Sequence, residues 1–173
     1  MPLISPIETN AQQLVIDETM RYLQLASDIF HHPFKPINIL FNLSGMASGM
    51  FLVKQGVPKI RYNPYIFAKH FDYSLANTVP HEVAHYVIFS LYGLKTVRPH
   101  GREWKDLMRQ FGAEPNCTST LDLDGIPTRR HKRHPYRCSC TDHLISSRRH
   151  NLITNGKAKY FCRSCRTELQ PSA

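Results

Sequence analysis

Apolar residues recur with a helical period near the start of the chain. Ile16, Leu23 and Phe30 lie seven residues apart, and further apolar residues flank each of them. Positions three, four and seven apart share one face of a helix, so the pattern predicts an amphipathic helix over residues 10–30. Thr9 and Gln12 fit a capping box at its start. The apolar face is expected to pack against a core.

Three short stretches are predicted as strands, over residues 37–43, 51–54 and 59–62. The first alternates and is rich in branched residues, and Gly45 and Gly49 mark turns after it. Gly56-Val57-Pro58 separates the other two. Branched and aromatic residues with a period of two predict strands. Asn63-Pro64 then turns the chain into a short helix over residues 65–70.

A more apolar helix is predicted between Asn77 or Thr78, which could cap its start, and Gly93, which ends it. Its apolar residues extend around much of its circumference, which predicts a buried helix. Another helix follows the loop around Pro99, and its apolar residues are spaced to face a core before Gly112 ends it. Strands and helices segregated in this way predict an α+β fold class.

The buried helix contains His81-Glu82-Val83-Ala84-His85, the pattern H-E-x-x-H. Residues four apart share one helix face, so both imidazoles can point at one metal ion. Zinc favours imidazole nitrogen, and a hydrolytic site needs three protein ligands and one open position for water. Glu82 could accept a proton from that water. A surface helix with two solvated histidines is the alternative, and the apolar context disfavours it.

His100 is the candidate third ligand. It lies at the start of the next predicted helix, fifteen residues after His85. A loop histidine that only caps this helix would be the simpler explanation if His100 were considered alone. Three histidines would complete a zinc site for metal-assisted hydrolysis of a peptide bond.

Four of the five cysteines cluster near the C-terminus, as Cys138-x-Cys140 and Cys162-x-x-Cys165. In a reducing compartment such pairs indicate metal ligands rather than disulfides. Their spacing predicts a closed tetrahedral zinc site in a zinc ribbon. His143 and His150 are possible substitute ligands. Cys117 stands alone and is interpreted as an incidental thiol.

The net charge of +9 is concentrated at one end of the chain. Residues 1–128 hold eleven basic and eleven acidic residues, whereas residues 129–173 hold eleven basic and two acidic ones. This asymmetry predicts a first domain over residues 1–115, a polar linker over 116–128 and a basic zinc-ribbon domain over 129–173.

Asn155-Gly156 is a strong signal for a type I′ turn, and it predicts a hairpin in the ribbon. One face of that hairpin would present Arg148, His150, Lys157, Lys159 and Arg163. Together with the other basic residues Arg129, Arg130, Lys132, Arg133 and Arg137, this face is a candidate for binding the phosphates of DNA. A solvated face that only aids solubility is the alternative.

Several motifs together resemble the SprT family of zinc metallopeptidases, which includes the eukaryotic DNA–protein crosslink protease Spartan. The matching stretches cover residues 78–85, 100–108, 136–140, 149–151 and 160–165. The resemblance implies a zincin-like domain in which His81, His85 and His100 bind zinc and Glu82 is the general base. An edge strand beside the metal pairs with the substrate in zincins, and residues 51–54 are the candidate.

The expected function is therefore a zinc-dependent metallopeptidase that acts on DNA-associated or DNA-crosslinked proteins. It would hold one catalytic and one structural zinc. Tyr62, Tyr86 and Arg98 are candidates for stabilising the oxyanion. One alternative is a nucleic-acid-binding regulator with purely structural zinc, and another is a peptidase whose ribbon binds acidic proteins.

The chain is also expected to be a cytoplasmic monomer. It has no apolar run long enough for a membrane span, and its first ten residues lack the pattern of a secretory signal.

Overall fold

The computed structural model describes residues 4–93, 96–118, 120–127 and 132–172. The chain forms two compact units, Met1–Thr128 and Arg129–Ala173. Each unit mixes helices with a small sheet, as the predicted α+β class requires. Among the helices of the described residues, none has the length and apolar character to cross a membrane.

The first unit contains a three-stranded sheet in which β2 occupies an edge. Its strands are β1 (Asn38–Leu40), β2 (Gly49–Lys54) and β3 (Val57–Tyr62), and their order is β1-β3-β2. β1 runs parallel to β3, and β2 runs antiparallel to it. All three predicted strands are therefore present, and β2 begins two residues earlier than predicted.

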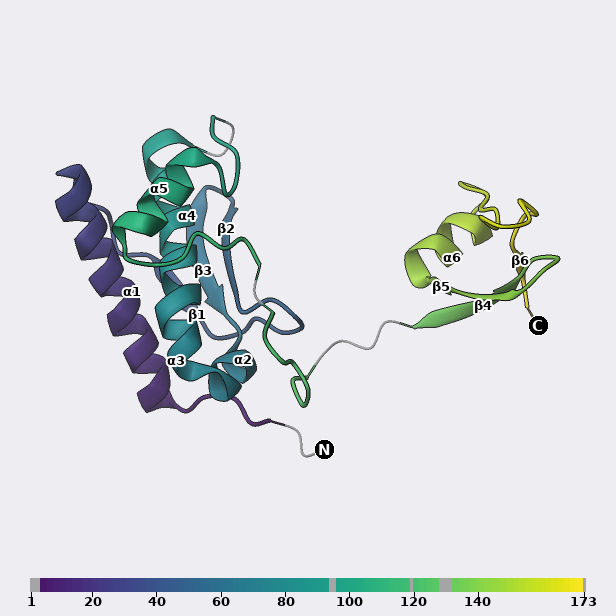
Figure 1. Cartoon of the computed structure of the whole chain (residues 1–173), viewed down its shortest axis with the longest axis horizontal. Helices are drawn as coiled ribbons and strands as arrows, with labels where there is room; N and C mark the ends of the chain where they lie inside the picture. Colours follow the sequence, from purple (N-terminus) through teal and green to yellow (C-terminus); the bar gives the residue numbers. More distant parts are fainter. Residues whose placement is uncertain (1–3, 94–95, 119, 128–131, 173) are drawn as a thin grey trace. The chain divides into compact units, whose positions relative to one another are not determined.

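Helix α4 (Val79–Tyr92) lies between α1 (Thr9–Phe30) and the sheet (Figure 1). Helix α5 (Arg102–Gln110) packs against α4. The amphipathic first helix and the helix that carries H-E-x-x-H are both confirmed. The capping box is wrong, because Glu8 is the N-cap residue and the Gln12 side chain donates to the carbonyl of Ile7.

From Phe71 onward the chain enters α4 without a break in helical backbone. α2 (Pro64–Lys69) is followed by α3 (Phe71–Tyr73), by the π-helix η1 (Ser74–Thr78) and then by α4. His70, between α2 and α3, is not helical. The predicted cap at Asn77 or Thr78 is wrong, since the backbone is already helical there. π-turns insert an extra residue into a helix and are frequent at functional sites. Gly93 ends α4 with a positive φ of 77°, as predicted.

The core of this unit packs the helices against one face of the sheet. Its largest fully buried side chains include Trp104, Tyr62 and Phe67. The Tyr62 hydroxyl lies 3.1 Å from the hydroxyl of Thr19, which in turn donates to the carbonyl of Val15. Burial of these polar groups is tolerated because each has a hydrogen-bond partner.

Asn63 organises the loop that precedes β2. Its side-chain oxygen accepts from the backbone N–H groups of Tyr65 and Ile66, which caps α2. Its side-chain nitrogen donates to the carbonyls of Gly45 and Ala47. The fully buried Asn63 thereby fixes the loop to the start of a helix.

The second half of the stretch predicted as a linker packs on the first unit. Lys69 forms a 2.6 Å ion pair with Asp122, and His70 bonds to the Asp122 carbonyl. The N–H of Ile4 donates to the carbonyl of Gly125, and the side chain of Ile126 is buried. Residues 122–126 are thus attached to the first unit.

The second unit is built on a small antiparallel sheet. β4 (Arg133–Arg137) lies between β5 (Asp142–Ser146) and β6 (Gln170–Pro171). Its core is small and contains Tyr136, Ile145 and Leu169 together with two cysteines.

The predicted hairpin around Asn155-Gly156 is wrong, because residues 147–154 form helix α6 (Ser147–Thr154). Gly156 adopts a positive φ of 66°, its N–H donates to Ile153, and the N–H of Lys157 donates to Leu152. This is the Schellman pattern of a helix C-terminus. Asn-Gly suits both turns because both need a left-handed residue, so the dipeptide alone does not distinguish them.

Candidate metal centres

Three imidazoles of the first unit converge on one point. The Nε2 atoms of His81 and His85 lie 3.2 Å apart, and each lies 3.0 Å from Nε2 of His100. His81 and His85 share one face of α4, and His100 reaches them from the turn before α5, where its φ is 57°. The structure thus brings together the three predicted ligand residues in a cluster that could hold a metal ion.

The electrostatics of the cluster favour neutral imidazoles. Burial lowers the pKa of His81 to about 4, with His100 acting in the same direction, and lowers that of His85 to about 3, with both neighbouring histidines contributing. A backbone hydrogen bond with Asn116 partly opposes the shift at His81. Neutral imidazole is the form that binds a metal, so this donor set fits zinc at neutral pH.

Glu82 is held beside the three histidines by the edge of the sheet. Its Oε2 accepts a 2.7 Å hydrogen bond from the backbone N–H of Phe51 in β2. Burial raises the pKa of the Glu82 carboxyl to about 8, and the bond from Phe51 acts in the opposite direction. A cation bound by the imidazoles would also favour the ionised carboxylate.

Gly49 makes room for that carboxyl. A Cβ atom at position 49 would lie 2.6 Å from Cγ of Glu82 and 2.9 Å from the methyl group of Thr78. Any larger residue would have to displace one of these groups. The glycine is therefore required by close approach between β2 and α4.

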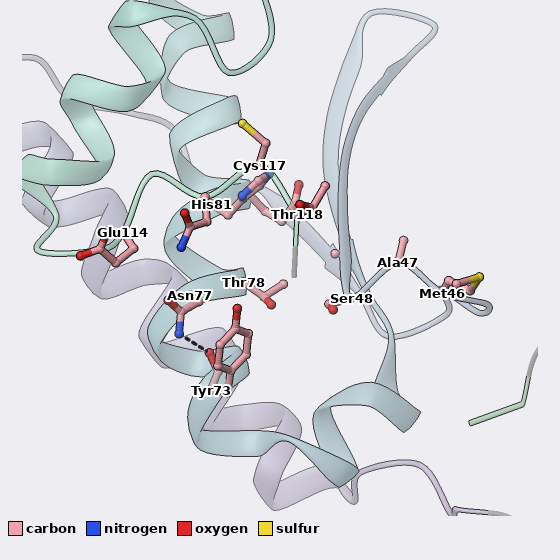
Figure 2. Close-up of a pocket in the computed structure, with 13 residues that line it drawn as sticks. Met46, Ala47, Ser48, Tyr73, Asn77, Thr78, His81, Glu114, Cys117 and Thr118 are labelled. Carbon is pink, nitrogen blue, oxygen red and sulfur yellow. Dashed lines mark hydrogen bonds between the residues drawn. The ribbon is translucent and has the colours of Figure 1, made fainter. Parts of the chain in front are cut away.

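Two pockets adjoin at the candidate metal site, where Gly49, His81 and Glu82 line both of them. One, of about 320 Å³, is walled by the 46–48 loop, η1 and residues 114–118 (Figure 2). The other, of about 390 Å³, runs along β2 toward the loop before α5 and is lined by Ile88, Phe89, Val97 and Trp104 among others. Together they form a groove across the candidate metal site.

Two of the three oxyanion candidates lie outside this groove. Tyr62 is fully buried and its hydroxyl bonds to Thr19, while the Tyr86 hydroxyl donates to the carbonyl of Lys35. Neither lines either pocket, so the structure disfavours both of these candidates. Arg98 lines the second pocket beside His100.

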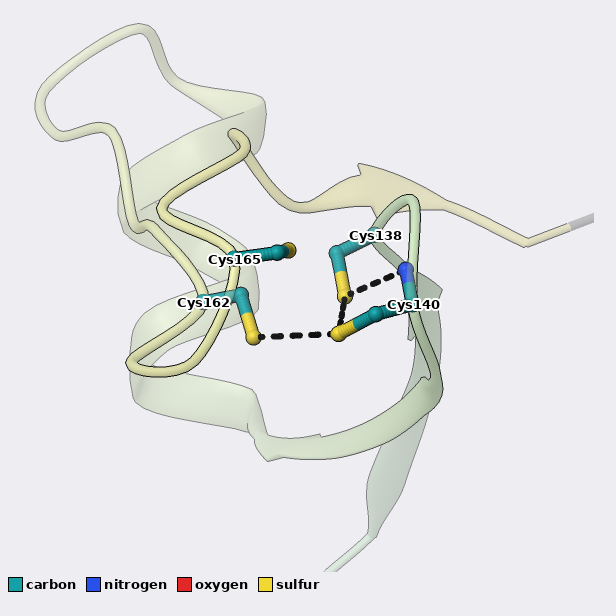
Figure 3. Close-up of side chains that lie close together, drawn as sticks. All are labelled: Cys138, Cys140, Cys162 and Cys165. Atoms are coloured by element: carbon teal, nitrogen blue, oxygen red, sulfur yellow. Dashed lines mark hydrogen bonds between the residues drawn. The ribbon is translucent and has the colours of Figure 1, made fainter.

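Four cysteines of the second unit form another candidate metal centre. Sγ of Cys138 lies 3.4 Å from that of Cys140, which lies 3.7 Å from that of Cys162 (Figure 3). All four sulfurs, including Cys165, lie within 4.8 Å of one another. A closed set of four thiolates is typical of a structural zinc site.

The thiol pKa values differ within the cluster. The pKa of Cys140 is raised to about 12, mainly by a hydrogen bond with Cys138. The pKa of Cys165 is lowered to about 5, mainly by a hydrogen bond with Ser139. Four adjacent thiolates repel one another, so full ionisation requires a bound cation.

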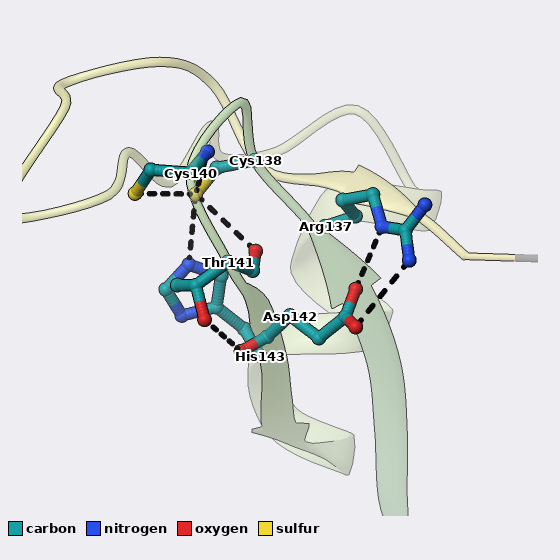
Figure 4. Close-up of polar contacts among 6 residues, drawn as sticks. All are labelled: Arg137, Cys138, Cys140, Thr141, Asp142 and His143. Carbon is teal, nitrogen blue, oxygen red and sulfur yellow. Dashed lines mark hydrogen bonds and ion pairs between the residues drawn. The ribbon is translucent and has the colours of Figure 1, made fainter.

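The two candidate substitute ligands have other contacts. Nε2 of His143 lies 3.2 Å from Sγ of Cys138, beside the 2.7 Å ion pair of Arg137 with Asp142 (Figure 4). His150 stacks on His134 at a ring distance of 3.8 Å and bonds to the Tyr136 hydroxyl. The candidate metal cluster consists of the four cysteines, and neither histidine belongs to it.

The basic residues do not share the predicted hairpin face. Arg148 lies on α6, Lys157 follows it, and Arg163 lies between two of the cysteines. Lys159 pairs with Glu168 at 3.2 Å. Arg129 and Arg130 lie outside the described residues. Arg148, Lys157, Lys159 and Arg163 are exposed, whereas His150 is half-buried and already bonded.

Comparison with known proteins identifies a family. A family model described as the SprT-like family matches residues 19–123, which include the three histidines and Glu82. The chain belongs to the SprT-like family. "Protein SprT" of Pasteurella multocida (strain Pm70) is 36% identical over 148 residues, covering 85% of this chain and 86% of the relative.

Other family members have similar coverage. "Protein SprT" of Vibrio parahaemolyticus serotype O3:K6 is 34% identical over 92% of this chain and 90% of the relative. That of Shewanella oneidensis is 33% identical over 91% of this chain and 97% of the relative. No solved structure matches the chain.

The sequence pattern does not identify three residues that lie around the site. It predicts Asn63 and Gly49 only as turns and Trp104 only as one of the apolar residues that face the core. Gly49 begins a strand rather than a turn, and a glycine inside a strand signals a close backbone approach. No comparable signal marks Asn63, whose partners lie 16–18 residues earlier.

Proposed function

We propose that this SprT-like chain is a zinc metallopeptidase. The main support is that three imidazole Nε2 atoms lie within 3.2 Å of one another. A buried carboxylate lies beside them, and the groove opens onto them. Three ligands and an open position are typical of catalytic zinc. A structural site has no need of a nearby glutamate that is not a ligand.

Glu82 would serve as general base and then general acid. A zinc ion at the three imidazoles would lower the pKa of a bound water and polarise the scissile carbonyl. Glu82 would accept a proton from the attacking water and would transfer it to the leaving amine. Its hydrogen bond to Phe51 sets the position of the carboxylate, and Arg98 remains the candidate for stabilising the oxyanion.

The groove supports an extended peptide as substrate. β2 lies at the edge of the sheet, and Gly49, Met50 and Phe51 of this strand line the groove. A peptide that adds to a sheet edge gains main-chain hydrogen bonds without a requirement for one sequence. This arrangement would be the zincin-like mode of substrate binding.

The basic ribbon would bind DNA and so bring DNA-associated or DNA-crosslinked proteins to the groove. The support is its charge, eleven basic against two acidic residues, with exposed Arg148, Lys157 and Arg163 on its surface. Cys138, Cys140, Cys162 and Cys165 would hold the structural zinc. The rival function is a DNA-binding regulator without peptidase activity.

The deciding experiment compares wild-type protein with Glu82→Gln on a DNA-bound protein substrate, with and without DNA. Glutamine keeps the shape and can still accept from Phe51, but it cannot take a proton. We expect cleavage to fall by about 10²–10⁴-fold with zinc content unchanged. Glu103→Gln, which removes an exposed carboxylate from α5, is the matched control and should cleave normally.

Cleavage by Glu82→Gln at the wild-type rate would remove Glu82 from the mechanism. Zinc-loaded wild-type protein that binds DNA but cleaves nothing would favour the regulator. The ribbon is tested separately by the salt dependence of DNA affinity. Arg148→Ala and Lys157→Ala should each reduce the log–log slope by about one, whereas Lys54→Ala in the electrically neutral first unit should not.

A further inference from the structure

The single tryptophan of the chain lies against all three histidines. The indole ring of Trp104 lies 4.7 Å from the ring of His81, 4.7 Å from that of His100 and 5.6 Å from that of His85. It is stacked on His85 at 28° and meets the other two edge to face. The imidazoles are themselves 4.7–4.9 Å apart, so four rings form one continuous cluster.

The position of Trp104 in the fold links the two sources of ligands. It lies on α5, four residues after His100, and its indole N–H donates to the backbone carbonyl of His81 on α4 at 3.3 Å. Its side chain is 1% exposed. One residue therefore ties the helix that carries two of the ligands to the turn that carries the third.

That turn alone is a weak support for a metal ligand. His100 has a left-handed φ of 57°, which is unfavourable for a residue with a side chain, and the N–H of Gly101 closes the turn on the carbonyl of Arg98. Rotation of an imidazole about χ2 is soft, so backbone geometry does not fix where Nε2 points. A rigid ring packed against each imidazole restricts that rotation.

We propose that Trp104 is a positioning residue for the metal site, holding the three imidazoles so that their Nε2 atoms converge before the metal binds. Trp104 is not a ligand, and it acts through His81, His85 and His100. The proposal rests on the metal site of the proposed function but not on peptidase activity. Neighbours that orient metal ligands commonly change metal affinity about 10–100-fold when they are replaced.

The test measures zinc affinity of the full chain carrying Trp104→Phe or Trp104→Leu, by competition with a chelator. The same titration of His100→Ala, which lacks one ligand of the histidine site, gives the zinc binding of the cysteine site alone. We expect affinity at the histidine site to fall in the order wild type, phenylalanine, leucine, because phenylalanine keeps a flat ring but loses the N–H. Cobalt spectra of that site should depart from the wild-type spectrum in the same order.

Leu107→Ala is the matched control, since Leu107 is equally buried on the same helix. It should destabilise the metal-free protein, as measured in denaturant, without changing zinc affinity of the folded protein. Unchanged affinity in Trp104→Leu, or an equal loss in Leu107→Ala, would show that Trp104 is only a core residue. These outcomes hold whether or not any variant cleaves protein, so they do not depend on the peptidase assay.

Discussion

The two candidate metal centres of this chain rest on different kinds of support. Around the three histidines is a large apolar core, which includes Val83, Val87 and Trp104 and extends from α1 to the sheet. Around the four cysteines there is very little core, and two of its five buried members, Cys138 and Cys162, are candidate ligands themselves. The first cluster is placed by its fold, whereas the second helps to make its fold.

This difference separates what a metal would do in each unit. Small units bury too little apolar surface to offset the entropy of ordering the chain, and metals commonly supply the deficit. The first unit has no such need, so a metal there is available for chemistry. The ligand sets agree with this difference. Four thiolates fill every coordination position of a tetrahedral zinc, whereas three imidazoles leave one position for substrate.

The largest expected effect is the loss of the ribbon fold when its metal site is destroyed. Cys162→Ala with Cys165→Ala should unfold residues 132–172, because structural zinc contributes on the order of 10 kcal/mol in small domains. The first unit should remain folded. Amide hydrogen exchange of the full chain would report both units at once.

His81→Ala with His85→Ala is the converse variant and should leave both units protected from exchange. If the ribbon stays protected without its cysteines, its small apolar core is sufficient and the contrast between the two supports is wrong. Unfolding of the first unit in the histidine variant would show that its fold, too, depends on the metal site.

A second, smaller effect concerns the metal-free first unit and its buried carboxyl. Burial raises the pKa of Glu82 to about 8 in the folded protein, so folding favours the protonated form. The contribution of Glu82 to stability should then be fully present below about pH 4.5 and be lost as the pH rises toward 8. Glu82→Gln carries no charge there and should be more stable than wild type by a few kcal/mol at pH 9.

Urea unfolding of the metal-free proteins at pH 5 and pH 9 checks this prediction. The histidines are common to both proteins, so their titration cancels in the difference. Saturating zinc should reduce the gap at pH 9, because the cation stabilises the ionised carboxylate. A gap that is the same at both pH values would mean that Glu82 is not held in an apolar environment.

How far the sequence predicted these features depends on the range of the interactions involved. The H-E-x-x-H helix and the paired cysteines are local patterns, and periodicity or spacing is sufficient to recognise them. The hairpin prediction failed because Asn155-Gly156 satisfies a helix end as well as a type I′ turn. In the structure Ser147–Thr154 is helical, and the Lys157 N–H donates to the carbonyl of Leu152 at the end of that helix.

The supports of the histidine site were not predictable because they join distant segments. Phe51 donates to Glu82 across 31 positions, and Trp104 donates to His81 across 23. Tyr62 and Tyr86 failed as oxyanion candidates for the same reason, because their partners Thr19 and Lys35 are 43 and 51 positions away. Sequence pattern identifies chemical groups, but tertiary packing determines which of them meet.

The smallest expected effect follows from one added methyl group. In Gly49→Ala the new Cβ would lie 2.6 Å from Cγ of Glu82 and 2.9 Å from the Thr78 methyl. Accommodating an extra methyl group in a packed core typically costs about 1–3 kcal/mol of stability. The clash should also displace the carboxylate from the Phe51 N–H and reduce peptide hydrolysis, while leaving zinc affinity at the histidines close to wild type.

Second substitutions separate this clash from general damage to β2. Thr78→Ser removes the crowded methyl and Glu82→Ala removes the crowded Cγ, so adding both to Gly49→Ala should recover stability measured in denaturant. Hydrolysis should stay low, since alanine has no carboxylate to act as the base. Full activity in Gly49→Ala would mean that Glu82 works equally well when displaced, and that β2 supports the groove without positioning the base.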